Sequence, residues 1–169
     1  MTKRRVVITG LGAVTPFGVG VDKFWHSLVE GKSGISTSEL IDVSKHVVKI
    51  SGEVKNFHPE EYLDPKEAKK MDRFIQFAMI AADEAVKDAK LEEVKDVDPY
   101  KIGVMVSSAA GGFRTFEENH IRILEKGPNK CSPFTIPMMI VNMASGRISM
   151  KYGFKGLNKV VVSACATGT

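Results

Sequence analysis

Val160-Val161-Val162-Ser163-Ala164-Cys165-Ala166-Thr167-Gly168-Thr169 is a short apolar run followed by a cysteine among small residues. A β-branched run of this length is typical of a buried strand. The small residues after Cys165 permit a sharp turn that exposes its sulfur at the end of a sheet, where several α/β enzymes hold a nucleophile. The alternative is a structural cysteine, because free cysteine is among the most buried residue types.

Length and composition indicate one ordinary globular domain with a sizeable core. The chain has 169 residues, 43% of them apolar and 26% charged, and no apolar run of membrane-spanning length or signal-peptide layout. Its two cysteines, Cys131 and Cys165, are far apart, which argues against a disulfide framework or a metal site and fits a reducing cytoplasm. The net charge of +4 is mild and not gathered in one block, so we expect neither nucleic acid nor a membrane as partner.

A glycine-rich turn follows a predicted first strand at residues 5–9. Gly10-Leu11-Gly12 resembles the start of a dinucleotide-binding fingerprint, but Thr15 stands where the third glycine should be. Pro16 falls where the phosphate-binding helix should already run, and no acidic residue follows at the expected distance. We therefore expect no nicotinamide or other cofactor, and interpret the glycines as shaping a tight loop.

Strand-like and helical segments alternate along the rest of the chain. Asp22 is a candidate N-cap for a helix over residues 23–29, and Asp64-Pro65 is a strong start for a helix running to about residue 90. Further segments are predicted as a short edge strand at 49–54, a buried strand at 102–107, a helix at 113–125, an extended stretch at 132–137, a helix at 138–152 and a strand at 160–162. This alternation predicts an α/β fold with a mainly parallel, buried sheet.

Six stretches, in order and spread over nearly the whole chain, resemble one family. They are Arg5-Val6-Val7-Ile8-Thr9-Gly10-Leu11-Gly12, Met71-Asp72-Arg73-Phe74-Ile75-Gln76, Glu117-Glu118-Asn119-His120, Ser132-Pro133-Phe134, Ile140-Val141-Asn142-Met143 and Ala164-Cys165-Ala166-Thr167-Gly168. Together they resemble the β-ketoacyl-[acyl carrier protein] synthases, most closely type II. The resemblance implies the thiolase-like fold, which has two similar layered α/β halves. Residues 1–169 would be an incomplete N-terminal domain, most of the first half.

The resemblance implies an acyltransferase of fatty-acid synthesis. Cys165 would carry an acyl chain as a thioester, and the carbanion from decarboxylating malonyl-[acyl carrier protein] would extend that chain by two carbons. The backbone N–H of Cys165 would donate to the developing oxyanion. On this resemblance we expect Cys165 to be the nucleophile.

The same resemblance implies roles for further residues and for partner molecules. Ala110 would lie at the floor of the acyl pocket, where a small residue would loosen the limit on chain length, and Thr135 and Ile136 would reach across a homodimer. Ile140 and Ala164 would also line that pocket. Lys66, Lys69 and Lys70 would form the basic patch on which the acidic carrier protein docks.

The family's two catalytic histidines, its lysine and its phenylalanine loop would lie beyond Thr169. We therefore expect residues 1–169 to be inactive alone and to associate with the remainder of their own chain. A polyketide ketosynthase, a thiolase using coenzyme A thioesters, or a non-catalytic chain-length partner remain alternatives. The presence of Cys165 speaks against the last. A cysteine hydrolase is disfavoured because no histidine has a convincing partnership with the thiol.

Overall fold

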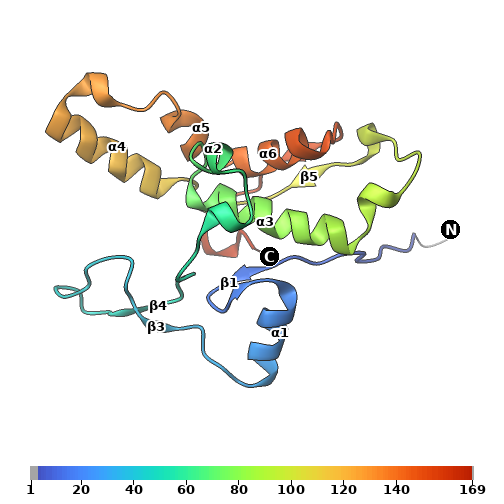
Figure 1. The fold of residues 1–169 in the computed structure, drawn as a ribbon, viewed down its shortest axis with the longest axis horizontal. Coiled ribbons are helices and arrows are strands. Elements are labelled where there is room, and N and C mark those ends of the chain that lie inside the picture. Colours follow the sequence, from blue (N-terminus) through green and yellow to red (C-terminus); the bar gives the residue numbers. More distant parts are fainter. Residues whose placement is uncertain (1–3, 169) are drawn as a thin grey trace. The chain divides into compact units, whose positions relative to one another are not determined.

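The computed structural model describes residues 4–168, which form two compact units (Figure 1). Unit 1 contains residues 4–58 and 80–94, and unit 2 contains residues 59–79 and 95–168. The boundary at residues 79 and 80 lies within one helix, α3 (Arg73–Asp88). The organisation of residues 1–169 as one domain stays a prediction.

Unit 1 consists of short hairpins, one full helix and the second half of α3. Its elements are β1 (Val14–Thr15), β2 (Gly18–Val19), α1 (Val21–Val29), β3 (Ser36–Thr37), β4 (Ile50–Ser51) and a 3-10 turn (Leu91–Glu93). β1 pairs with β2 and β3 with β4, both antiparallel. The predicted helix at 23–29 and the edge strand at 49–54 are thus present in slightly different bounds.

A side chain from α3, and not Asp22, accepts a free N–H group at the N-terminal end of α1. The prediction of Asp22 as the N-cap is therefore wrong. Gly20 occupies the N-cap position, and the Val21 N–H donates to Glu84 Oε1 at 2.8 Å. Glu84 Oε2 also accepts the Ala13 N–H at 2.9 Å. A carboxylate from another element thus satisfies one of the orphan N–H groups that a cap would serve.

The glycine-rich turn packs directly on α3. A Cβ at Gly10 would lie 2.2 Å from the Ala85 carbonyl oxygen, and one at Gly12 only 1.8 Å from that of Ala81. The Leu11 N–H donates to Asp88 Oδ2 at 3.0 Å. The turn therefore serves close packing against a helix, which agrees with its interpretation as a tight loop.

The predicted first strand at residues 5–9 is wrong for this structure. The segment forms no ladder among the described residues, and Val6 and Ile8 are 93% and 83% exposed. An apolar β-branched run predicts that a segment suits a sheet, but a strand exists only where a neighbour takes up its N–H and C=O groups. The described residues of unit 1 offer this segment no such neighbour.

Unit 2 contains the first half of α3 and all the helices and strands that follow it. Its other elements are α2 (Pro65–Ala68), β5 (Val104–Met105), α4 (Phe113–Lys126), α5 (Thr135–Met139), α6 (Met143–Tyr152) and β6 (Asn158–Lys159). Four 3-10 turns lie at Pro59–Glu61, Pro99–Lys101, Pro128–Lys130 and Ala164–Ala166. β5 and β6 pair in parallel with α6 beside them (Figure 1), and this confirms the α/β class with a parallel pairing.

The sheet is less extensive than predicted. Among the described residues each of the three pairings joins two-residue strands. The predicted buried strand at 160–162 is wrong here, because Val161 is 52% exposed and its N–H donates to the Ser107 hydroxyl at 3.1 Å instead of to a strand. As for residues 5–9, the apolar residues at 160–162 suit a sheet, but no neighbouring strand pairs with them in the described residues.

Two of the predicted helices are each interrupted. The helix expected from residue 65 to 90 is split into α2 and α3 at residues 69–72, and the one expected at 138–152 is split into α5 and α6. α5 also takes in part of the stretch predicted to be extended. Asp64 caps α2 as predicted by accepting the Lys66 and Glu67 N–H groups, and α4 confirms the helix predicted at 113–125.

The core of unit 2 lies around α3 and α6. Ile75 and Ser145 are completely buried, and the other buried apolar residues of this unit are Leu63, Ala68, Met71, Met79, Val104, Ala144 and Ile148. The Ser145 hydroxyl lies 2.9 Å from Asn158 Oδ1, and Asn158 Nδ2 donates to the Ser149 hydroxyl at 2.7 Å. These contacts fix α6 against β6, from which the chain runs on toward Cys165.

Candidate active site

Cys165 lies in a sharp turn and its side chain is exposed. It is the middle residue of the 3-10 turn Ala164–Ala166. The Ser163 N–H donates to Thr167 Oγ1 at 3.0 Å, and that hydroxyl donates to the Ala164 carbonyl at 2.7 Å. The predicted turn is therefore present, and the thiol is exposed in the described residues.

The backbone around Cys165 has two features suited to chemistry. Ala164 has φ 49°, a left-handed conformation that costs a residue with a Cβ about 1–2 kcal/mol and is found at functional sites where the surrounding structure enforces it. In residues 4–168 no acceptor receives the Cys165 N–H. The role of that amide as an oxyanion donor stays a prediction.

Two of the segments predicted to line the acyl pocket lie against each other. The Gly112 N–H, two residues after Ala110, donates to the Met139 carbonyl at 2.9 Å. At Gly111, where φ is 66°, a Cβ would lie 2.4 Å from that same carbonyl oxygen. The loop that carries Ala110 therefore lies against the C-terminal end of α5, the helix that begins at Thr135.

The residues predicted to line the acyl pocket are mostly exposed. Thr135 is half-buried, and the other predicted lining residues, Ala110, Ile136, Ile140 and Ala164, are exposed. None of the five lines either of the two cavities described below. Their roles therefore stay predictions.

The three predicted docking lysines differ in their surroundings. Lys66 and Lys69 are exposed and form no ion pair within the described part of the chain. Lys70 is 38% exposed and its ammonium lies 2.6 Å from Glu67 Oε1. The predicted basic patch thus presents two unpaired cations and one that is already paired.

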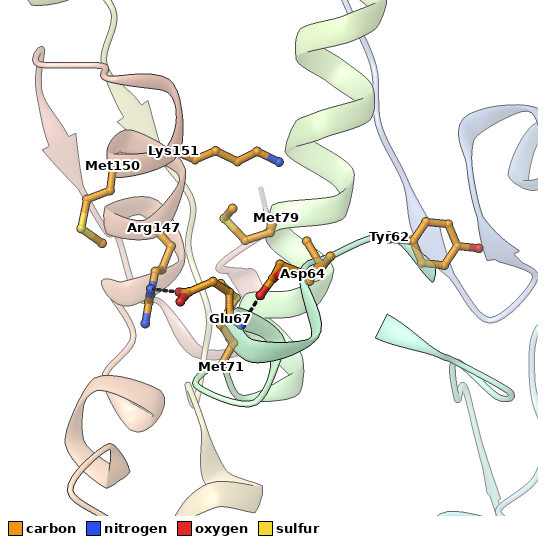
Figure 2. A pocket seen from close by; sticks show the side chains of 9 residues that line it. Tyr62, Asp64, Glu67, Met71, Met79, Arg147, Met150 and Lys151 are labelled. Atoms are coloured by element: carbon orange, nitrogen blue, oxygen red, sulfur yellow. Dashed lines mark hydrogen bonds and ion pairs between the residues drawn. The ribbon is translucent and has the colours of Figure 1, made fainter. Parts of the chain in front are cut away.

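A cavity beside Glu67 was missed by the sequence analysis. It has a volume of about 370 Å³, and Figure 2 shows the Arg147 guanidinium facing the Glu67 carboxylate on its wall, at 3.1 Å. Its lining residues are Tyr62, Leu63, Asp64, Glu67, Met71, Met79, Arg147, Met150 and Lys151. The (i, i+3) spacing of Glu67 and Lys70 was visible in the sequence. The pairing of Glu67 with a residue 80 positions away was not.

Hydrogen bonds and charges lower the pKa of Glu67. The hydrogen bond from Lys70 is the largest cause, followed by the charge of Lys70, and the charge of Arg147 acts in the same direction. Glu67 is therefore ionised near neutral pH and holds both cations.

A second cavity, of about 450 Å³, lies on the Lys69 side of α2. It is lined by Pro59, Glu60, Pro65, Ala68, Lys69 and Gln76. Gln76 Nε2 donates to the carbonyl of Ala68 at 2.9 Å and to that of Met71 at 3.2 Å. This side chain connects α3 to the end of α2 and supports the segment that carries the three lysines predicted to dock the carrier protein.

A buried polar network also escaped the sequence analysis. Asp72 Oδ2 accepts the Thr115 N–H at 3.0 Å and the Thr115 hydroxyl at 2.6 Å, while Oδ1 accepts the Phe74 N–H at 3.3 Å. Asn119 donates to the Thr115 carbonyl at 2.8 Å and accepts the Ser132 N–H at 3.1 Å. This network explains why Asp72, Asn119 and Ser132 stand in three of the six recognised stretches, to which the sequence analysis gave no role.

Residues 4–168 contain no group of three or more His, Cys, Asp or Glu side chains suited to hold a metal ion. In the same range no helix is long and apolar enough to cross a membrane.

The family model described as "Beta-ketoacyl synthase, N-terminal domain" matches residues 3–169. The chain therefore belongs to the β-ketoacyl synthase family. It is 45% identical over 169 residues to the 3-oxoacyl-[acyl-carrier-protein] synthase 2 of Synechocystis sp. (strain ATCC 27184 / PCC 6803 / Kazusa). It is 47% identical over 166 residues to the synthase of the same name from Staphylococcus aureus (strain N315). The chain spans 40% of the length of each of these relatives.

Solved structures show the same fold. A structure described as the ishigamide ketosynthase/chain length factor superposes with a TM-score of 0.86 at 26% identity, over 98% of this chain and 41% of that one. A β-ketoacyl synthase from Burkholderia phymatum STM815 superposes with a TM-score of 0.72 at 23% identity, also over 98% of this chain and 41% of that one. The thiolase-like fold expected from the sequence is thereby confirmed.

Proposed function

We propose that the protein is a condensing enzyme of fatty-acid synthesis that extends an acyl chain held on Cys165. One observation carries the proposal: the thiol is exposed in a tight turn with a left-handed residue before it. The identity of 45% and 47% to proteins named 3-oxoacyl-[acyl-carrier-protein] synthase 2 supports the reaction class.

In the first half-reaction, the Cys165 thiolate attacks the carbonyl carbon of an acyl-[acyl carrier protein] thioester. A new C–S bond forms, the old one breaks, and the carrier thiol leaves with a proton. In the second, malonyl-[acyl carrier protein] loses CO₂ and its carbanion attacks the acyl carbon, which releases the cysteine. The free Cys165 N–H stabilises the oxyanion of each tetrahedral intermediate, a contribution of about 3–4 kcal/mol for one donor.

The remaining residue roles belong to the same proposal. Ala110, Thr135, Ile136, Ile140 and Ala164 surround the acyl chain, with Thr135 and Ile136 reaching the partner subunit of a homodimer. Lys66, Lys69 and Lys70 receive the acidic carrier protein. The enzyme works in the cytoplasm, and residues 1–169 act together with the rest of the polypeptide.

A polyketide ketosynthase is the second candidate, because one structural neighbour is described as a ketosynthase/chain length factor. Its identity to this chain is 26%, against 45% and 47% for the fatty-acid synthases. The larger identity favours the fatty-acid reaction.

The test is the intact mass of the full-length protein before and after exposure to a medium-chain acyl-[acyl carrier protein]. We expect a gain of one acyl group that is absent from Cys165→Ala. Cys131→Ala is the matched control, because Cys131 is the other exposed cysteine of the chain and should leave acylation intact.

A folded full-length protein that gains no acyl group would refute the proposal. If the gain disappeared in Cys131→Ala and persisted in Cys165→Ala, Cys131 and not Cys165 would be the nucleophile. Acylation from coenzyme A thioesters alone would point to a thiolase.

A further inference from the structure

The segment of α2 carries one acidic residue among its lysines. The Glu67 carboxylate has two cationic partners: Oε1 lies 2.6 Å from Lys70 Nζ, and Oε2 lies 3.1 Å from Arg147 Nη1. Lys70 is three residues further along the chain, whereas Arg147 comes from α6. One carboxylate therefore neutralises a docking lysine and is itself held by a second, distant cation.

The two partners of Glu67 differ in exposure. Lys70 is 38% exposed and Arg147 only 19%. An exposed ion pair contributes little to stability and is screened by salt, so Lys70 can exchange Glu67 for another carboxylate at small cost. The less exposed pair is screened less, and Arg147 retains Glu67.

Arg147 has an unused donor for this purpose. Its Nε is buried and has no hydrogen-bond acceptor within the described residues. A guanidinium can bind a carboxylate through two parallel N–H groups. The Glu67 oxygen that Lys70 releases is therefore a candidate acceptor for this orphan donor, because the other oxygen of the same carboxylate already lies 3.1 Å from Arg147 Nη1.

The cavity beside this pair permits such a rearrangement. Met71, Met79 and Met150 line its wall near Arg147 (Figure 2). Methionine side chains are unbranched and adapt to small shifts of their neighbours. The methionine part of the wall can therefore adjust to small shifts of Arg147 and Glu67.

We infer that Glu67 and Arg147 control carrier-protein docking by holding Lys70 in reserve. The acidic partner first meets the unpaired Lys66 and Lys69, and then draws Lys70 away from Glu67. Arg147 keeps the abandoned Glu67 neutralised, so that its charge does not repel the partner. The inference rests on the proposed function, because the partner that it requires is an acyl carrier protein.

Three variants of the full-length protein separate the steps. Glu67→Gln releases Lys70 in advance, and it should tighten carrier binding about 3- to 10-fold and steepen its salt dependence. Arg147→Met leaves Glu67 to Lys70 alone, and it should weaken binding by a similar factor of about 3 to 10. In the Glu67→Gln background, Arg147→Met should change binding by less than about twofold, because the two residues act through one contact.

The measurement is fluorescence anisotropy of a fluorescein-labelled acyl carrier protein, titrated at low and high salt. Glu61→Gln and Arg114→Met are the matched controls, since each makes the same change of charge outside α2: Glu61 lies in the turn Pro59–Glu61, and Arg114 in an ion pair with Glu118 on α4. A second readout is the condensation reaction, in which the KM for the carrier substrate should change and kcat should not. Circular dichroism checks the fold of Arg147→Met. If Arg147→Met does not fold, the binding measured for Glu67→Gln tests the inference by itself.

Tighter binding by Glu67→Gln than by Glu61→Gln, together with non-additivity in the double variant, would support the inference. Equal effects of Glu67→Gln and Glu61→Gln would overturn it while leaving the proposed function intact. The inference would also be overturned if the wild type were acylated on Cys165 but substitution of Lys66 and Lys69 did not change carrier-protein binding. Failure of acylation itself would remove the proposed function and the inference together.

Discussion

Asp72 shows how a single residue connects the starts of two helices, α3 and α4. Its carboxylate accepts the N–H groups of Phe74, in the first turn of α3, and of Thr115, in the first turn of α4. Negative charge at a helix N-terminus is favourable, and each bond satisfies an N–H that has no intrahelical acceptor. Since Asp72 is only 7% exposed, it serves both helices inside the core of unit 2.

Asp72→Ala should destabilise the full-length protein by about 2–4 kcal/mol, because it removes caps from two helices and leaves the buried Thr115 hydroxyl without its acceptor. The free energy of unfolding in denaturant measures this. Asp98→Ala is the matched control: Asp98 is exposed and its carboxylate accepts the Tyr100 N–H at 3.0 Å, so we expect a loss of about 1 kcal/mol or less. Equal losses would show that the second helix contact contributes nothing.

Between elements, the contact of the glycine-rich turn with α3 depends on the absence of a side chain. Gly12→Ala would place a Cβ 1.8 Å from the Ala81 carbonyl oxygen, inside the backbone of α3, which cannot move aside cheaply. We expect a loss of about 3 kcal/mol or more in the free energy of unfolding.

Gly146→Ala is the control for that substitution. Gly146 lies within α6, and a Cβ there would meet no atom within 4 Å. Alanine favours a helix over glycine by about 1 kcal/mol, so this variant should be more stable than the wild type. If Gly12→Ala were tolerated as well as Gly146→Ala, the turn would not pack on α3 as described.

The carboxylate of Glu53 forms hydrogen bonds that hold the loop after β3 against the hairpin of β3 and β4. Glu53 accepts hydrogen bonds from the Ser38 hydroxyl and from the Glu39 N–H, the latter at 2.9 Å. The bond from Ser38 is the largest cause, and that from Glu39 the next, of a pKa lowered to about 2 from its ordinary value of 4.5. The ionised form is therefore the one that the fold stabilises.

A carboxyl whose pKa is lower in the folded state contributes stability above its ordinary pKa and loses it as the pH falls toward the folded value. The stability contributed by Glu53 should accordingly disappear between pH 4.5 and about 2. Glu53→Gln should flatten the dependence of the unfolding free energy on pH in this window. An identical acid profile for Glu53→Gln and the wild type would contradict the assignment.

At the scale of the whole molecule, charge should govern how fast the carrier protein arrives. The chain has a net charge of +4, and Lys66 and Lys69 are exposed and unpaired among the described residues. Attraction between charges is screened beyond about 8 Å at physiological salt, so it acts mainly on the association rate. That rate should fall several-fold from low to high salt.

Stopped-flow association of acyl carrier protein with the full-length protein tests this expectation. The double variant Lys66→Glu and Lys69→Glu should bind more slowly and show less dependence on salt. Lys45→Glu, at an exposed site of unit 1, is the control for a change of charge elsewhere. An association rate that ignores ionic strength in the wild type would count against docking on α2.

The sequence alone was sufficient for the α/β class, the turn at Cys165, the cap at Asp64 and the family. These features depend on local order: β-branched runs, small residues after a cysteine, and a capping residue before proline all act over a few neighbours. The strands at residues 5–9 and 160–162 could not be decided locally, because a strand requires a partner that the segment itself does not specify.

Only the tertiary structure determines which polar and charged side chains pair with one another. Glu67 and Arg147 are 80 residues apart, and Asp72 and Thr115 are 43 apart, so no periodicity relates them. The contacts of Asp72 also explain a local outcome, since its carboxylate accepts the Phe74 N–H where α3 begins. The physical reason is that a carboxylate accepts hydrogen bonds from the donors that the fold brings within reach, wherever those donors stand in the sequence.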